Sequence, residues 1–231
     1  MCANYKFVKI DENFRGKTLS SWMAEWVQWV HSGSVSYTSR FGEILFIRGN
    51  LSYDYKYPGG PRIQTDADRP YEEEVFISNN VPVYVNIRTA FYFISEPHPF
   101  TTLNTLTDVI SACRDDHSHG GTREKHITEL INPANINDTV NQQTELNSVD
   151  HIEAFGINIK VDPNSQLADQ FEFPVQRGAD LIGCAVGEIC LIKSLPDGDY
   201  FIETSNTGAR GYKSGSKYVI HVGPDRAMSP F

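Results

Sequence analysis

Short β-type runs separated by turns constrain the fold of this chain more than any other feature. Eight runs rich in β-branched and aromatic residues lie between positions 42 and 222, and turn signals such as DPNS, PDGD and NTGARGYKSG separate the later ones. Only two segments have helical periodicity. The runs are GEILFIRG, EVFIS, VPVYVNIRTAFYFI, VDHIEAFGINIKV, DQFEFPV, AVGEICLIKSL, DYFIETS and KYVIHV.

This distribution of elements predicts a mainly β protein rather than a βαβ fold. We expect an antiparallel β-sandwich, jelly-roll-like, with an N-terminal Trp-rich helix and one further helix. The 231 residues and 40% hydrophobic content suit one such domain over residues 1–231. Strands are predicted within 42–94 and 148–222, and a helix and a loop within 101–147.

The first helical segment, predicted over 18–31, carries all three tryptophans of the chain. Its apolar residues recur at spacings of three and four and therefore share one face of a helix. Ser20 or Ser21 is the predicted N-cap, and His31 with Gly33 marks the end. We favour burial of this face against a sheet over an aromatic platform for a sugar or a protein partner. The apolar residues are Leu19, Trp22, Met23, Trp26, Trp29 and Val30.

The second helical segment begins near TTLNTLTDV. Its apolar residues, from Leu103 to Cys113, recur at spacings of three and four, with Thr101 or Thr102 as the predicted cap. We expect this helix to end before His117. The stretch 131–147 is rich in Asn, Gln and Thr and is predicted to be a loop.

The balance of charge limits the partners of the chain. The chain has 20 Lys and Arg and 29 Asp and Glu, which gives a net charge of −9. This negative charge disfavours binding to nucleic acid and to anionic membrane surfaces. The start, MCANYKFVKIDENF, lacks the apolar run of a signal peptide, so we expect cytoplasmic synthesis, with a virion as one destination. The cysteines Cys2, Cys113, Cys184 and Cys190 have no C-x-x-C spacing and are predicted to be free thiols.

The stretch CRDDHSHGGTREKH, residues 113–126, carries the strongest metal-like spacing. His117, His119 and Glu124 match the H-x-H-x(3,4)-E spacing with which cupins hold a divalent metal. The resemblance is partial, because the histidine of the second cupin motif would fall at Phe201 and because a helix precedes His117. A charged helix C-terminus that ends at Gly-Gly explains the same residues without a metal.

Other candidate sites rest on fewer residues. Tyr53, Tyr55 and Tyr57 alternate along an extended segment and therefore share one face, which could stack a sugar or pack on the sheet. A two-histidine, one-carboxylate metal site drawn from His98, His151 or His221 would need the fold to bring two of them together. No G-x-S-x-G or phosphate-loop motif is present, so no catalytic residue is assigned and no cofactor beyond a divalent metal is considered.

The block SSWMAEWVQWV near the start of the chain predicts a Trp-rich helix before the strands, and the block LPDGDYF near its end predicts a Leu-Pro-x-Gly turn before two closing strands. These blocks resemble a family of β-rich proteins of unassigned function from marine bacteria and their phages. The family offers no catalytic residues. Its members usually follow a signal peptide, whereas this chain starts almost at the helix, so we expect an intracellularly made form such as a phage product. The matching residues are Trp22, Trp26, Trp29, Phe46, Gly49, Pro82, Leu195, Pro196, Gly198, Tyr218, Ile220 and Val222.

From these features we expect a non-catalytic interaction or assembly protein, such as a phage virion-surface or structural component. It would bind protein partners or copies of itself, with the loops 51–73 and 113–147 facing the partner. The alternatives are a carbohydrate-binding module that uses Tyr53, Tyr55 and Tyr57, and a cupin-like metal-dependent enzyme that uses His117, His119 and Glu124.

Overall fold

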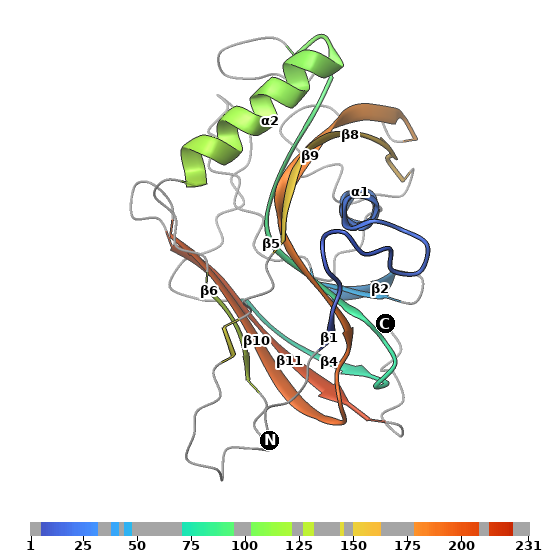
Figure 1. The fold of residues 1–231 in the computed structure, drawn as a ribbon, viewed down its shortest axis with the longest axis vertical. Helices are drawn as coiled ribbons and strands as arrows, with labels where there is room; N and C mark the ends of the chain where they lie inside the picture. Colours follow the sequence, from blue (N-terminus) through green and yellow to red (C-terminus); the bar gives the residue numbers. More distant parts are fainter. Residues whose placement is uncertain are drawn as a thin grey trace.

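The computed structural model describes residues 6–31, 38–41, 44–47, 71–94, 103–121, 127–131, 144–145, 150–162, 178–207 and 213–223. Within these ranges the protein is mostly β, with two sheets and two helices, so the predicted β-rich class is confirmed (Figure 1). The predicted strand DQFEFPV lies outside the described residues.

The first sheet has six strands around the long strand β9. Strand β5 pairs with β9 on one side, while β8 and β1 pair with different parts of β9 on the other; β3 and β2 continue beyond β5. The pair β3–β5 is parallel and the other pairs are antiparallel. The strands are β1 (Lys6–Phe7), β2 (Thr38–Phe41), β3 (Ile44–Ile47), β5 (Val83–Phe93), β8 (Asp150–Lys160) and β9 (Asp180–Ser194).

The second sheet has five strands in the order β4, β11, β10, β6, β7, and its pair β4–β11 is parallel. Both sheets are therefore mixed, which differs from the purely antiparallel pairing expected. Strand β4 separates β3 from β5 in sequence but belongs to the other sheet, and such a crossover lets β3 and β5 run the same way. The strands are β4 (Tyr71–Ile77), β6 (Ile127–Ile131), β7 (Thr144–Glu145), β10 (Gly198–Thr207) and β11 (Lys213–Val222).

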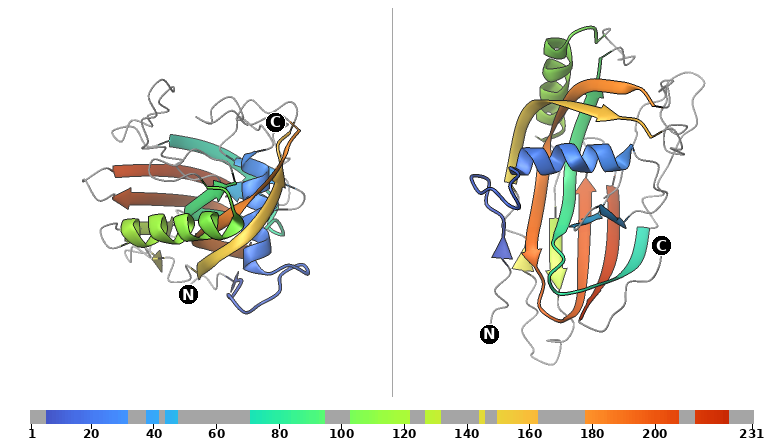
Figure 2. Two further views of the ribbon diagram at one scale, coloured as in Figure 1. Left: turned by 90° about the horizontal axis from the view of Figure 1, so that it is seen from above. Right: turned by 90° about the vertical axis from the view of Figure 1, so that its right-hand side faces the viewer.

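The first sheet is the central layer of the molecule (Figures 1 and 2). Helix α1 (Leu19–Val30) covers one face, and the opposite face packs on helix α2 (Leu106–Gly121) above and on the second sheet below. In β3, Ile44 and Phe46 belong to the cluster under α1, whereas Leu45 and Ile47 belong to the cluster between the sheets. Burial on both faces explains why this strand is apolar throughout.

An irregularity in strand β5 changes which residues face each layer. Val83 and Val85 lie in the cluster between the sheets, but beyond a register shift between Asn86 and Arg88 it is Ala90 and Tyr92 that face α2. One extra residue in a strand reverses the alternation of its two faces. Before the shift, the odd-numbered residues of β5 therefore face the second sheet. Beyond the shift, its even-numbered residues face α2.

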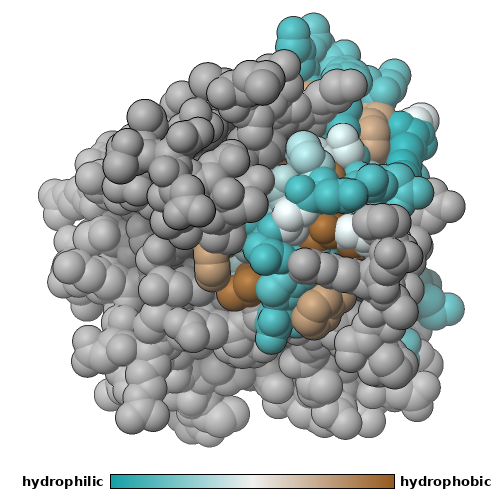
Figure 3. Space-filling model, turned by 90° about the horizontal axis from the view of Figure 1, so that it is seen from below, coloured by the Kyte–Doolittle hydropathy of each residue, from teal (hydrophilic) through white to brown (hydrophobic). Residues whose placement is uncertain are grey.

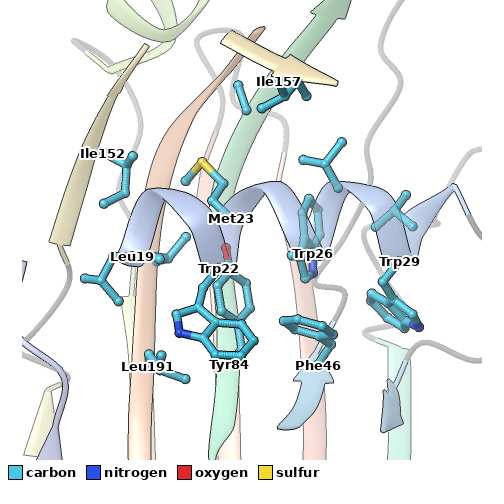
Figure 4. Close-up of a cluster of buried hydrophobic side chains, with 14 of the residues drawn as sticks. Leu19, Trp22, Met23, Trp26, Trp29, Phe46, Tyr84, Ile152, Ile157 and Leu191 are labelled. Carbon is cyan, nitrogen blue, oxygen red and sulfur yellow. The ribbon is translucent and has the colours of Figure 1, made fainter. Parts of the chain in front are cut away.

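Helix α1 agrees closely with its prediction. It spans Leu19–Val30 with His31 as C-cap, and Figure 4 shows its tryptophans along the side that meets Phe46 and Tyr84. The whole predicted stripe is buried, so packing on a sheet is confirmed and an exposed aromatic platform is wrong. The N-cap is Thr18 rather than Ser20 or Ser21, since the Thr18 hydroxyl accepts a hydrogen bond from the Ser21 amide.

Helix α2 begins later and ends later than predicted. Its start is capped by Thr105, whose hydroxyl accepts from the Asp108 amide while the Asp108 carboxylate accepts from the Thr105 amide. The helix continues through the histidines to Gly121, because the Gly-Gly pair is the first strong signal for a helix end. Strands β6 and β7 follow, in residues expected to be helix or loop.

Neither described helix is long and apolar enough to cross a membrane.

Candidate functional site

The site residues predicted from the sequence are only partly within the described chain. Tyr53, Tyr55, Tyr57, His98 and Glu124 lie outside the described residues, so the sugar-stacking prediction stays a prediction. His117 and His119 lie in helix α2, where the backbone is helical. The cupin pattern needs a strand at this point, because alternate residues share a face in a strand and not in a helix.

The metal alternatives find no support in the described ranges. No group of three or more His, Cys, Asp or Glu side chains there is arranged to hold a metal ion. His151 lies on β8 in the first sheet and His221 lies on β11 in the second, so the fold does not place them on neighbouring strands. Instead, the His151 ring lies 3.5 Å from the carboxylate of Glu153.

The most organised polar cluster that the structure describes is on the outer face of the second sheet. In β11, Tyr218, Ile220 and Val222 are buried in the core between the sheets, so Val219 and His221 point to the other side. The register pairs His221 with Asp199 of β10 and with Phe76 of β4. We call Glu74, Phe76, Asp199 and His221 the His221 cluster.

The imidazole of His221 is held from both ends. Its Nδ1 lies 2.6 Å from Oδ1 of Asp199, and its Nε2 lies 2.5 Å from Oε1 of Glu74. The ring also stacks on Phe76, with the centroids 4.5 Å apart and an angle of 17° between the planes. The side chain of His221 is 17% exposed, compared with 61% for Glu74.

This geometry fixes what the cluster can do. Both ring nitrogens of His221 lie within hydrogen-bond distance of a carboxylate oxygen, one from β10 and one from β4. The cluster therefore links β4, β11 and β10 across the outer face of the sheet.

An apolar row lies beside the His221 cluster. Val219 pairs with Phe201 of β10 and with Glu74 of β4, and the Phe201 residue is 39% exposed. Within the described residues, four large hydrophobic residues are exposed: Phe201, Ile10, Leu106 and Ile182. We call Phe201, Val219 and the His221 cluster the outer patch.

The outer patch thus combines an apolar centre with two carboxylates and one imidazole. This is the composition of an interface with an aromatic anchor and a polar rim. Seen from below, the coloured residues of the molecule are mainly hydrophilic, with small hydrophobic areas between them (Figure 3).

The sequence analysis considered His221 only as a metal ligand and did not pair it with Asp199 or Glu74. The pairing with Asp199 follows from a hairpin whose paired residues are symmetric about position 210, inside the predicted NTGARGYKSG turn. The contact with Glu74 depends on a parallel strand far away in sequence and has no local signal.

Comparison of the chain with protein-family models, with curated proteins and with solved structures finds no match. The resemblance to β-rich proteins of marine bacteria and their phages therefore stays a hypothesis carried by the quoted residues alone.

Proposed function

We propose that this chain is a non-catalytic assembly protein that contacts other copies of itself through the outer patch. The observation that carries the proposal is the exposed ring of Phe201 beside a histidine held in place by two carboxylates. A contact surface that is already ordered loses little side-chain entropy when it binds.

The order of the outer patch comes from three adjacent strands. Glu74, Asp199 and His221 come from β4, β10 and β11, so the hydrogen bonds across the sheet resist rearrangement of its outer face. Strand β4 stands at the end of the described strand order, and the cluster fastens it to its neighbours.

Three further features support an assembly role. The chain is acidic, which disfavours nucleic acid and membranes as partners. Its three tryptophans are buried in the core beneath α1, so they do not form an exposed ligand-binding platform. The resemblance to phage-associated proteins agrees with a virion-surface or other structural component, and we extend the proposal to that setting.

The test is the subunit number of the protein in solution. Native mass spectrometry and light scattering should find a discrete oligomer for the unmodified protein and mainly monomer for Phe201→Ser. Ile10→Ser is the matched control, because Ile10 is 55% exposed and lies in the turn after β1, which is a strand of the first sheet. It should keep the oligomer of the unmodified protein.

Two results would overturn the proposal. One is a monomer at all concentrations tested, and the other is an oligomer that Phe201→Ser leaves intact. The same native spectrum also reports bound metal. A stoichiometric divalent ion, lost on replacing His117 or His119, would favour the metal-dependent alternative instead.

A further inference from the structure

The inner face of helix α2 brings two cysteines together. Cys113 lies on α2 and Cys184 on β9, and both are fully buried in the small cluster that joins the helix to the first sheet. The Sγ of Cys113 lies 3.3 Å from the carbonyl oxygen of Cys184. Val109 and Val186 complete the buried centre of this contact.

The Cys113 side chain also affects the Cys184 thiol. A hydrogen bond from the Cys113 side chain is the largest cause of a lowered pKa of this thiol; burial acts in the opposite direction, and the charge of Arg114 adds to the lowering. A lowered pKa raises the thiolate fraction, which is the reactive form of cysteine. In the proposal below, Cys184 is therefore the attacking thiolate.

Cys190 provides an internal contrast on the same strand. It lies on β9 in the other cluster, between the two sheets, and burial raises the pKa of its thiol. A buried thiol with a raised pKa is unreactive. Of the three cysteines that the structure describes, Cys113 and Cys184 are the two that share a buried cluster.

We propose that Cys113 and Cys184 form a reversible disulfide that fastens helix α2 to the first sheet when the protein meets an oxidising disulfide. The proposal is independent of the assembly role. It assigns a covalent modification to a pair that the sequence analysis expected to remain free thiols.

The chemistry balances by two thiol–disulfide exchanges. The Cys184 thiolate attacks one sulfur of a small disulfide such as oxidised glutathione, and the first glutathione leaves as a thiolate. The Cys113 thiol then loses its proton and attacks the Cys184 sulfur, which expels the second glutathione. Two cysteine thiols are oxidised, and one glutathione disulfide is reduced to two thiols.

Access to the pair requires local opening of α2. Both sulfurs are buried, but the helix rests on few fully buried apolar residues, since Leu106 at its start is 38% exposed and Ile110 is half-buried. Elements with few buried contacts open before the whole domain unfolds. The disulfide should therefore form slowly in native buffer and faster in urea below the unfolding transition.

The experiment uses the intact protein in redox buffers of oxidised and reduced glutathione. After acid quenching, intact mass should show a loss of two hydrogens, and a peptide map should show Cys113 linked to Cys184. The Cys190→Ser variant is the matched control and should oxidise like the unmodified protein. Cys113→Ala and Cys184→Ala should each abolish the intramolecular link.

The peptide map of the unmodified protein needs no variant, so the test stands even if a variant fails to fold. Oxidation should also raise the midpoint of thermal unfolding, and dithiothreitol should reverse the rise. The proposal fails if Cys113 and Cys184 stay reduced in oxidising buffer with subdenaturing urea. It also fails if either is linked to Cys2 or Cys190 instead.

Discussion

The indole nitrogen of Trp26 donates a hydrogen bond to the backbone carbonyl of Ile47 at 3.2 Å, and both groups are buried. This bond joins the middle of helix α1 to the end of strand β3. It satisfies a polar group that would otherwise be buried in an apolar layer, where an unpaired carbonyl costs stability.

Replacing Trp26 by Phe should therefore destabilise the protein beyond the loss of ring area. We expect a drop in the free energy of unfolding of about 2–4 kcal/mol, from the lost bond and the cavity. Chemical denaturation measures it. Trp22→Phe is the matched control, because its indole bonds to the Phe14 carbonyl at a partly buried position, and a larger loss there would contradict the argument.

Replacing Tyr84 by Phe is expected to change the free energy of unfolding in the opposite direction. Its side chain is fully buried between Trp26 and Phe46, burial raises the pKa of its phenol, and its hydroxyl has no hydrogen-bond partner within the described residues. Removing an unsatisfied buried hydroxyl relieves its desolvation cost. Tyr84→Phe should leave the unfolding free energy unchanged or raise it by about 1 kcal/mol. A clear loss of stability would show that the hydroxyl is satisfied in solution.

Gly183 is required by close packing of strands. A Cβ at this position would lie 2.2 Å from the backbone oxygen of Tyr92 and 2.5 Å from the ring of Phe93. Because a backbone atom cannot move aside cheaply, Gly183→Ala should cost about 3 kcal/mol or more. At Gly156 the nearest atom is the flexible end of Leu106 at 3.4 Å, so Gly156→Ala should cost much less. Equal losses in thermal denaturation would contradict this difference.

The cap of helix α2 predicts a dependence on pH. Hydrogen bonds from the Thr105 side chain, then from the amides of Thr105 and Asn104, lower the pKa of Asp108 below its usual 3.8. A carboxyl whose pKa is lowered on folding stabilises the protein above the unfolded pKa. That stability is lost as the pH falls through the folded pKa.

The measurement is the melting temperature of the unmodified protein and of Asp108→Asn at a series of pH values. The unmodified protein should melt higher well above pH 3.8, and the difference should shrink as the pH falls below it. Thr105→Ala should reduce the pH dependence, since the Thr105 hydroxyl is the largest cause of the shift. A difference that does not vary with pH would count against the cap.

Local periodicity predicted the elements that carry strong patterns. The Trp-rich stripe specifies α1 almost to the residue, and the apolar runs around Ile192 and Ile220 locate β9 and β11. Strands β6 and β7 were missed because ITELI is short and TE carries no alternation. The start of α2 was misplaced because three threonines precede it, and the local capping pair of Thr105 and Asp108 was not recognised.

Long-range pairing explains the remaining differences. Parallel contacts between β3 and β5 and between β4 and β11 leave no local signature, so the sequence pattern favoured a purely antiparallel arrangement. The same limit applies to the outer patch. The hairpin that places Asp199 beside His221 is local, whereas Glu74 arrives from a strand 147 residues away.

The extra residue of strand β5 near Asn86 divides the strand into two halves. In one half the odd-numbered side chains face the second sheet, and in the other half they face α1. Toward Val83, a polar change at an odd position would disturb the packing between the sheets, whereas toward Phe93 the same change would fall on the side of α1. A one-residue deletion between the halves would transfer the aromatic rings of Phe91 and Phe93 to the side of α2, where small residues such as Ala90 and Cys113 now fit. The chain length at this one point therefore determines which layer each later side chain of the strand can join.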